Sequence, residues 1–564
     1  MSLFGALNIG SSALAAQQAA LSVTGNNIAN AGNANYTRET ATLTPGSDQQ
    51  VQPGIFLGSG VDLTAVQRQV DESLNARLRG SNSDAQGATT NQNWLSQVES
   101  SFNALGTNNI STQMSTFFTG WSNLANNPQD SGLRQVVLQN GQSVANSLTS
   151  EQTQLTGIQT SLQAQIASTA QNADSLASQI ATINGQIVTS AGGSAGSPNA
   201  LLDQRDSLLT QLSTLVNITT VPQATGSVNV YVGSEPLVMN ATSNGIAVQQ
   251  TSVNNEPVST VVFKNNNAPL PLTSGQLSAM QNVQTQVTGA INQVDDLAHN
   301  LIGAVNDIHA SGQGTSGYSS VTATNAVTDP NVALNLAGAG LSFPATNGSF
   351  VVSVTNTTTG ISTSTLVPVN LTGSATDTTL NSLAASLNAI NGVSATINNG
   401  KLTVASTSSG STISFSQDSS NMLAGLGINT FFTGTDASDI AVNQTLQADP
   451  TLLAAAKNGD AGDNQTALAI AALNTQPLAS GTSLQDQYQN TINTVAGQVA
   501  TATTESQAAA AVQSTLTTQQ QSLSGVSLDE ESINMLTQQR AYQGAAMFIT
   551  TLNNMMTSLL AMIP

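Results

Sequence analysis

The sequence contains few charged residues and no cysteine. Charged residues make up 7% of the 564 residues and aromatic residues 3%, whereas typical soluble proteins contain about 25% charged residues. Without cysteine the chain has no disulfide, no thiolate metal ligand and no cysteine nucleophile. The sequence is rich instead in small and uncharged polar residues, namely Ser, Thr, Asn, Gln, Ala and Gly. A surface of this kind suits close packing against similar copies, although compositional drift is the alternative explanation.

The scarcity of basic residues limits the partners that the chain can bind. Its net charge is −20, and its only lysines are Lys264, Lys401 and Lys457. A phosphate-binding surface needs clustered Arg and Lys, so the sequence argues against nucleic acid and against anionic membrane surfaces as partners. We expect no transmembrane helix, because no run of about 18 apolar residues occurs. We also expect no general secretory signal peptide, because the first basic residue is Arg38.

The two ends of the chain carry matching apolar repeats. Residues 1–37 and 541–564 contain no charged side chain, so a free helix formed by either segment would be poorly soluble. Apolar residues recur every seven residues near the start and every three or four near the end, which is the spacing of a coiled-coil seam. We predict that this seam packs the two ends against each other and against neighbouring copies. Its residues are Leu7, Leu14, Leu21 and Ile28, with Tyr542, Ala545, Ile549, Leu552, Met556, Leu559 and Ile563.

Between the ends the pattern changes from helix to strand and back. Val66, Val70, Leu74 and Leu78 step by four and predict a helix from near Thr64. The alternating residues of 228–232 predict a strand. A hairpin turn is expected at Asn398-Asn399-Gly400.

These changes predict an α+β multidomain fold. The paired terminal helices form a coiled-coil stem on a helix-rich body, and a mostly-β domain is inserted into that body. The predicted boundaries are residues 1–64 with 530–564 for the stem, 65–317 with 441–529 for the body, and 318–440 for the inserted domain. A small β subdomain of the body is expected near residues 216–272.

The densest acidic cluster is Ser527-Leu528-Asp529-Glu530-Glu531. Three carboxylates could hold a divalent cation or perform acid–base chemistry. A helix start explains these residues better, because Ser527 can cap the helix while Glu530, three residues later, reaches back to the cap. Asp529 and Glu531 then lie at the positive end of the helix dipole. We therefore interpret Ser527 and Glu530 as a helix cap.

Arg205 and the two histidines are the other candidates for chemistry. Arg205 shares a face of a predicted helix with leucines, so we expect its stem to lie along them with the charge in water, rather than in an anion site. His299 and His309 lie ten residues apart on a predicted helix, too far to bind one metal ion without a bend. We expect both histidines at the surface.

No sequence motif of an enzyme is present. The chain contains no G-x-S-x-G, no H-E-x-x-H, no Walker loop and no dinucleotide fingerprint. The sequence therefore predicts no catalytic residue, no cofactor site and no metal site.

Several segments together resemble one family. Gly25-Asn26-Asn27-Ile28-Ala29-Asn30, followed by Tyr36-Thr37-Arg38, is similar to the N-terminal signature of flagellar rod, hook and hook-associated proteins. Later segments resemble the flagellar hook-associated protein 1 family, the hook–filament junction proteins. They are Gly58-Ser59-Gly60-Val61 with Val66-Gln67-Arg68, the segment Asn199–Asp206, the segment Gly427–Gly434, the segment Gly525–Glu531 and Gln538-Gln539-Arg540-Ala541-Tyr542.

The resemblance implies a structural protein of the bacterial flagellum rather than an enzyme. Such a protein is secreted through the flagellar type III apparatus without signal cleavage and lies outside the cell. It would assemble at the hook tip as the junction between hook and filament, with its paired terminal helices forming an inner tube. The implied partners are the hook protein, the second hook–filament junction protein, further copies of the chain and an export chaperone at the C-terminal helix.

Two other functions stay open on the sequence alone. A secreted surface adhesin with a β-rich display domain would account for the Thr-, Ser- and Asn-rich β segments, but not for the matching repeats at the two ends. An extracellular hydrolase would need a pocket that holds a polar cluster with shifted pKa values.

Overall fold

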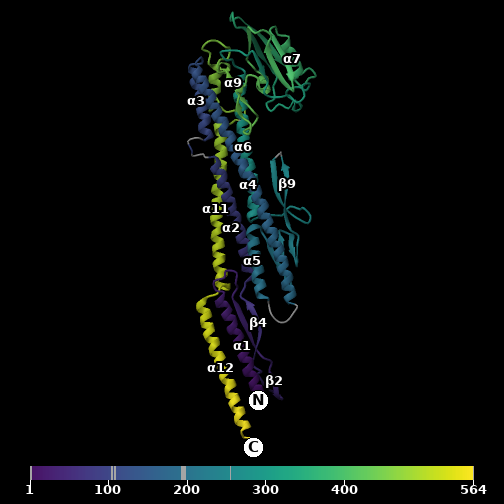
Figure 1. Ribbon diagram of the computed structural model, residues 1–564, viewed down its shortest axis with the longest axis vertical. Coiled ribbons are helices and arrows are strands. Elements are labelled where there is room, and N and C mark those ends of the chain that lie inside the picture. Colours follow the sequence, from purple (N-terminus) through teal and green to yellow (C-terminus); the bar gives the residue numbers. More distant parts are fainter. Residues whose placement is uncertain are drawn as a thin grey trace. The chain divides into compact units, whose positions relative to one another are not determined.

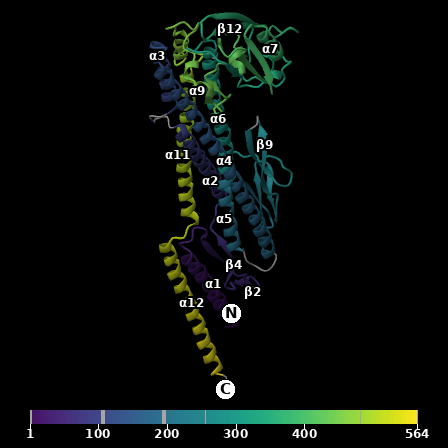
Figure 2. The same ribbon diagram turned by 45° about the horizontal axis from the view of Figure 1, so that its top comes forward.

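The fold was analysed in a computed structural model, which describes residues 3–102, 106, 109–191, 198–253, 256–479 and 481–562. The chain forms two compact units (Figures 1 and 2). Unit 1 comprises Met1–Trp94, Ser161–Gln284 and Ala500–Pro564, and unit 2 comprises Leu95–Thr160 and Thr285–Val499. Long helices and several small sheets together confirm the α+β class. The three-part division into stem, body and inserted domain stays a prediction.

Most of the helical residues lie in a few long helices. The helices wholly within unit 1 are α1 (Leu3–Ala29), α5 (Asn199–Leu215) and α12 (Leu528–Leu560). Four helices contribute residues to both units: α2 (Glu72–Phe102), α4 (Ser131–Ala191), α6 (Gln276–Ala310) and α11 (Leu484–Ser524). Within unit 1, α2 and α11 are joined by hydrogen bonds of Gln513 to Asn82 at 2.8 Å and of Ser506 with Thr89 at 3.2 Å. No helix of the described chain is long and apolar enough to cross a membrane.

The strands of unit 1 form small antiparallel sheets. The strands are β1 (Glu39–Pro45), β2 (Gln49–Gln52), β3 (Ile55–Leu57), β4 (Val61–Arg68), β5 (Thr219–Pro222), β6 (Val228–Val232), β7 (Glu235–Met239), β8 (Thr242–Ser243), β9 (Ile246–Val253) and β10 (Glu256–Phe263). β1 pairs with β4, β2 with β3 and β9 with β10, and β5 to β8 form a sheet in sequence order. The alternation of residues 228–232 therefore predicted β6 correctly, within a β-rich stretch at the expected place.

The helix predicted from near Thr64 begins later in the structure. Residues Val61–Arg68 form β4, which pairs with β1 with Val66 opposite Ala41. The four-residue step of apolar side chains was therefore misleading across this stretch, where pairing with a distant strand decides the backbone conformation. α2 starts at Glu72, after Asp71, whose carboxylate accepts the N–H groups of Ser73 and Leu74.

Unit 2 combines short helices with two three-stranded sheets. Its own helices are α3 (Ile110–Asn126), α7 (Leu380–Asn388), α8 (Met422–Leu426), α9 (Gln444–Ala448) and α10 (Gln465–Ala472). Its strands are β11 (Ser320–Thr322), β12 (Gly348–Asn356), β13 (Ser362–Val369), β14 (Val393–Asn398), β15 (Lys401–Ser406), β16 (Ser411–Ser416), β17 (Phe432–Thr433) and β18 (Ala441–Val442). The sheet orders are β11-β15-β14 and β13-β12-β16, with β17 paired to β18. The predicted hairpin is confirmed, because Asn399 and Gly400 join β14 to β15 with φ of 48° and 74°.

His309 is part of the core of unit 2, so the expectation of a surface histidine was wrong. Its side chain is 0% exposed and lies near Trp121 and Phe431. The N–H of Ala454 donates to Nε2 at 3.0 Å, so Nδ1 carries the proton and donates to the carbonyl of Asn429 at 2.8 Å. Burial lowers the pKa of His309 to about 4, and the neutral ring is a structural group.

His299 is half-buried rather than at the surface. Its ring stacks on Phe343 with centroids 4.4 Å apart, and its Nδ1 lies 2.9 Å from the carbonyl oxygen of Thr435. Both histidines are therefore held by contacts from residues far away in sequence.

Glu151 makes the stability of unit 2 depend on pH. Its buried carboxylate accepts a hydrogen bond from Ser101 at 2.9 Å, and burial raises its pKa to about 7. The pKa of this carboxyl is higher in the folded state than in the unfolded state, where it is near 4.5. The free energy of unfolding therefore rises as pH falls from about 7 to about 4.5. We expect Glu151→Gln to be more stable than the parent at pH 8 by about 2–3 kcal/mol, since one pKa unit corresponds to about 1.4 kcal/mol.

This difference should shrink as pH falls below 7 and nearly vanish near pH 4, where the parent carboxyl is neutral in both the folded and the unfolded state. Urea unfolding followed by the fluorescence of Trp121, at several pH values, measures it. Glu99→Gln on the exposed face of α2 is the matched control and should show no such trend. A constant offset between Glu151→Gln and the parent from pH 5 to 8 would contradict the assignment.

The paired terminal helices and their charged base

The helices at the two ends of the chain pack against each other in unit 1. α1 and α12 are in contact along their lengths and lie side by side in both views (Figures 1 and 2). Thr24 Oγ1 donates to Gln538 at 2.9 Å, and Gly10 lies against Ile549. The partner number falls as the number in α1 rises, so the two helices run antiparallel.

Small residues form the buried face of α1. They include Ala6, Gly10, Ala16 and Ala20. A Cβ atom added to Gly10 would lie 2.8 Å from Cγ1 of Ile549, closer than side-chain atoms can normally approach. The absence of a side chain at position 10 therefore lets α12 come close to α1.

The predicted seam residues surround this close contact. Leu7, Leu14, Leu21 and Ile28 are half-buried on α1. On α12, Leu552 is 7% exposed, Tyr542, Ala545, Ile549 and Met556 are half-buried, and Leu559 is 53% exposed. Ile563 lies outside the described residues. The pair of helices thus leaves part of the seam uncovered, and its role between copies stays a prediction.

A further set of apolar side chains on α12 is exposed. Met547, for example, is 73% exposed. The set comprises Ile533, Leu536, Met547, Phe548, Met555, Leu559 and Leu560, and Met562, just beyond the end of the helix, is exposed as well. Exposed apolar surface of this extent on one helix marks an interaction site.

Asn27 joins the two helices at the base of the pair. Its side chain is 1% exposed and donates from Nδ2 to Glu531 at 3.0 Å and to the carbonyl of Glu39 at 2.9 Å. Its Oδ1 accepts the N–H of Glu39 at 3.0 Å and the hydroxyl of Tyr36 at 2.8 Å. Burial raises the pKa of Tyr36, helped by the nearby carboxylates of Glu39, Asp203 and Glu531, so the phenol keeps the proton that it donates.

Glu531 is 2% exposed and receives a second strong contact. Nε of Arg38 donates to Glu531 at 2.9 Å, and the same guanidinium pairs with Glu530 at 3.1 Å. The backbone N–H of Arg38 also donates to the carbonyl of Ser524, just before α12 begins. The guanidinium thus compensates a carboxylate that would otherwise be buried without a partner.

Ser527 lies at the N-cap of α12, where the sequence placed it. Its Oγ accepts the N–H of Glu530 at 3.5 Å. The carboxylate of Glu530 pairs with Arg38. Ser527 therefore caps α12, whereas Glu530, which was expected to reach back to the cap, instead joins α12 to the segment that follows α1.

A second layer of ion pairs connects this base to α5. Nη1 of Arg68 donates to Asp203 at 2.7 Å and to Asp206 at 2.9 Å, and the N–H of Thr37 donates to Asp203 at 3.2 Å. Burial lowers the pKa of Arg68, but Asp206 and Asp203 more than offset this effect, so the pKa is raised. The segment Asn199–Asp206, singled out for its resemblance, thus holds the end of β4 and the segment after α1.

Arg205 is buried, so the expectation that its charge lies in water was wrong. Its guanidinium donates to the carbonyl of Gly226 at 3.0 Å and pairs with Asp206 at 3.2 Å. The contact with Gly226 depends on how α5 meets its neighbours in space, which leucine spacing on one helix does not reveal.

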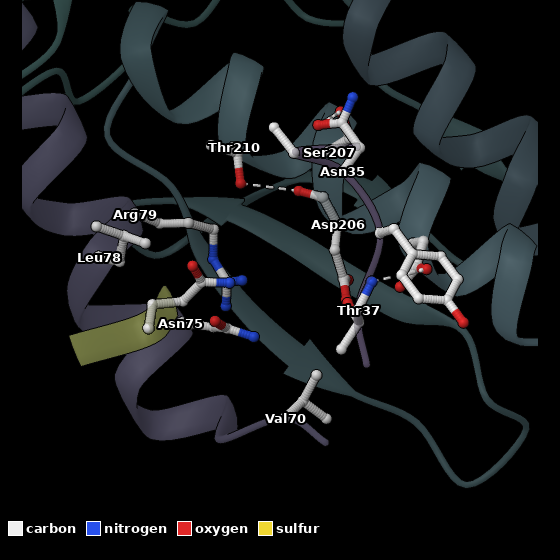
Figure 3. Close-up of a pocket in the computed structure, with 13 residues that line it drawn as sticks. Asn35, Thr37, Val70, Asn75, Leu78, Arg79, Asp206, Ser207 and Thr210 are labelled. Atoms are coloured by element: carbon white, nitrogen blue, oxygen red, sulfur yellow. Dashed lines mark hydrogen bonds between the residues drawn. The ribbon is translucent and has the colours of Figure 1, made fainter. Parts of the chain in front are cut away.

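A small polar cavity of about 120 Å³ lies beside these ion pairs (Figure 3). Figure 3 shows Asn75 and Arg79 of α2 on one side and Asp206 of α5 on the other, with Thr37 nearby. Arg79 is buried and donates to Thr220 at 2.8 Å. Burial lowers the pKa of Arg79, against the opposing effect of Asp206. The charged side chains around the cavity are thus held by protein partners, in an arrangement that fastens segments together.

The acidic cluster at the start of α12 does not form a metal site in the described part of the chain. Among the described residues, no group of three or more His, Asp or Glu side chains could hold a metal ion. Glu530 and Glu531 are bound by Arg38, as described above.

The sequence analysis missed Asn27 and the small-residue face of α1. Asn27 was noticed only as part of a resemblance. Ala6, Gly10, Ala16 and Ala20 were overlooked because the search for a seam followed large apolar residues. Their signal was the spacing of four between 6 and 10 and between 16 and 20.

Three protein families match parts of the chain. The flagellar hook-associated protein FlgK helical domain matches residues 95–322, the flagella basal body rod protein matches residues 7–37, and the flagellar basal body rod FlgEFG protein C-terminal family matches residues 519–562. The last two matches fall on α1 and α12 and on the residues that fasten them.

Full-length relatives agree with these families. Flagellar hook-associated protein 1 of Escherichia coli strain K12 is 27% identical over 98% of this chain and 99% of its own length. Its counterpart in Salmonella typhimurium is 27% identical over 98% of this chain and 99% of its own length. The protein of the same name from Bacillus subtilis is 31% identical over 38% of this chain and 44% of its own length.

A solved structure shares the fold. The flagellar hook junction protein FlgK from Burkholderia pseudomallei matches with a TM-score of 0.51 and 17% identity, over 80% of this chain and all of that chain. The matches extend over nearly the whole length of the chain and point to a structural protein of the flagellum, outside the cell, and not to an enzyme. The chain belongs to the flagellar hook-associated protein 1 family.

Proposed function

We propose that the chain assembles at the tip of the hook and joins the hook to the filament, held there by its α1–α12 pair. The observation that carries this proposal is the exposed apolar surface of α12, because the helix pair covers only part of the apolar side chains that it presents. Removing apolar surface from water contributes about 25 cal/mol of free energy per Å², which favours covering this surface with similar helices of neighbouring copies.

The composition of the helix pair suits such packing. Residues 1–37 and 541–564 contain no charge, so neighbouring copies could approach without burying an unpaired charge. Half-buried Leu7, Leu14 and Leu21 offer a second apolar stripe next to the first. Copies of the chain are therefore the first partner, and the hook protein and the second hook–filament junction protein are the neighbours on either side.

An export chaperone is the partner proposed for α12 before assembly. The exposed methionines of this helix, Met547 and Met555, and Met562 just after it would be an aggregation hazard in a free protein. A chaperone that covers them until export would remove that hazard. Methionine adapts its shape to different surfaces, which suits a helix that exchanges one partner for another.

The relatives of the chain do not support the alternative of a secreted adhesin. The relatives matched over 98% of the chain are flagellar proteins, and the β-rich stretches belong to the same matched chain. A hydrolase likewise has no supporting observation, since the charged groups around the cavity of Figure 3 are held in ion pairs and hydrogen bonds.

Electron microscopy of flagella from a strain that lacks the gene tests the proposed position. We expect hooks without filaments, with filament subunits shed into the medium, and normal filaments when the intact chain is supplied again. Filaments of normal length on the hooks of the deletion strain would overturn the proposal.

A further inference from the structure

Apart from the close packing of Gly10 against Ile549, the contact between α1 and α12 contains little that would fix how far one helix is shifted along the other. The buried face of α1 consists largely of small residues, including Ala6, Gly10, Ala16 and Ala20. A shift by one helical turn, about 5.4 Å, would place Ile549 opposite Ala6 or Leu14 instead of Gly10, so the small side chain of Ala6 makes the shift in one direction the less unfavourable of the two. Neither α1 nor the last 24 residues of the chain contain a charge that would oppose such a shift.

Directional contacts between the helices lie at one end of the pair. Asn27 donates to Glu531, and Thr24 donates to Gln538. The first contact is buried on both sides and is completed by Arg38, Tyr36 and Glu39, which are not part of either helix. Asn27 therefore holds α12 in a fixed position relative to β1 and to the segment after α1.

We infer that Asn27, Glu531 and Arg38 set the register of the α1–α12 pair. A shift by one turn would move Glu531 away from both partners, leaving its buried carboxylate without Arg38 and Asn27 and removing one of the four hydrogen bonds of the Asn27 side chain. Such groups are costly to leave unpaired. A single buried polar residue can select one register of a helix pair in the same way.

This inference deepens the proposed function, because the register decides where the exposed side chains of α12 lie relative to the rest of unit 1. Copies that differ in register would present Met547 and Met555 at different heights. Neighbouring copies could then not pack in the same way. Asn27 is a positioning residue in this account and contacts no partner itself.

The absence of cysteine allows the register to be measured directly by disulfide formation. Gly10→Cys with Ile549→Cys reports the observed register, since positions 10 and 549 face each other. Gly10→Cys with Ala545→Cys or with Asn553→Cys reports a shift of one turn in either direction. The last two proteins also carry Ile549→Ala, which makes room for the new Cβ at position 10. Disulfides form only over short distances, with Cα atoms about 4.4–6.8 Å apart.

We expect the purified full-length protein to cross-link at 10/549 and not in the shifted pairs. Asn27→Ala should lower the 10/549 yield by about tenfold relative to the shifted pairs, the order expected when a buried hydrogen bond to a charged group is lost. Asn26→Ala, on the exposed side of the same helix, is the matched control and should leave all yields unchanged.

Cross-linking of Asn27→Ala that stays confined to 10/549 would overturn the inference. So would the loss of every cross-link, because Asn27 would then hold the helices together without selecting a register. The cross-links form within one chain, so the result does not depend on where the protein assembles. A failure of the proposed function would appear in the deletion strain and leave this experiment unaffected.

Discussion

Leu552→Asp is expected to abolish assembly while the rest of the chain stays folded. Leu552 is the most deeply buried of the apolar seam residues on α12. The segment 541–564 contains no cation that could pair with a new carboxylate. Burying an unpaired charge costs several kcal/mol or forces the group to take up a proton, and either outcome weakens the α1–α12 pair. Cells should then release filament subunits into the medium.

Asn554→Asp is the matched control for this substitution. It adds the same charge two residues away, at a position that is exposed on the same helix. Both variants should unfold with the parent's main thermal transition, since much of the core lies outside the terminal pair. Filament attachment should be lost in Leu552→Asp and largely kept in Asn554→Asp. Normal filaments on hooks that carry Leu552→Asp would contradict the role of the helix pair.

Arg68→Leu is expected to destabilise unit 1 by about 3–5 kcal/mol, the usual effect of removing one partner of a buried ion pair. The Arg68 side chain is almost fully buried and binds Asp203 and Asp206 from one nitrogen. Without it, two carboxylates lose their shared cation in a partly buried site. Asp203 also holds the backbone of Thr37, so the segment between α1 and β1 should loosen as well.

Urea unfolding can measure this effect in unit 1 separately. The chain contains two tryptophans, Trp94 in unit 1 and Trp121 in unit 2. A background with Trp121→Phe leaves Trp94 as the fluorescent reporter. Arg77→Leu is the matched control. It removes an exposed arginine from α2, the helix that follows β4, and should change stability by less than about 0.5 kcal/mol. Equal effects of the two substitutions would show that the ion pairs contribute little.

The sequence was enough to predict that the ends of the chain pair and that β segments interrupt a helical chain. Both features follow from local periodicity. Terminal segments without charged residues need a cover whatever their detailed contacts, and the alternation of residues 228–232 marked β6 without knowledge of its neighbours. The two-residue turn at Asn399-Gly400 was recognisable because its positive φ angles favour Asn and Gly.

The features that were not predicted depend on residues far apart in sequence. His309 is buried because Asn429 and Ala454 bind both of its nitrogens. Arg205 is buried next to Gly226, whose carbonyl accepts a hydrogen bond from its guanidinium. β4 is a strand because β1 pairs with it. Spacing along one helix or strand contains no information about any of these partners.

The site itself was predicted only in outline. The heptad leucines are half-buried on α1, whereas Gly10, which the sequence analysis did not single out, lies in close contact with Ile549 of α12. A seam was sought among large apolar residues because these dominate coiled coils. In this pair, large side chains of α12 lie over small ones of α1. A buried asparagine, rather than a leucine, connects the helices to the rest of unit 1.

Electron cryo-microscopy of the hook–filament junction in intact flagella tests the central claim most directly. We predict that α1 and α12 lie in the inner wall and that helices of neighbouring copies cover Met547, Met555 and Leu559 of α12. Terminal helices that face bulk solvent, in an assembly whose copies touch only through unit 2, would contradict the claim that this helix pair holds the protein in the flagellum.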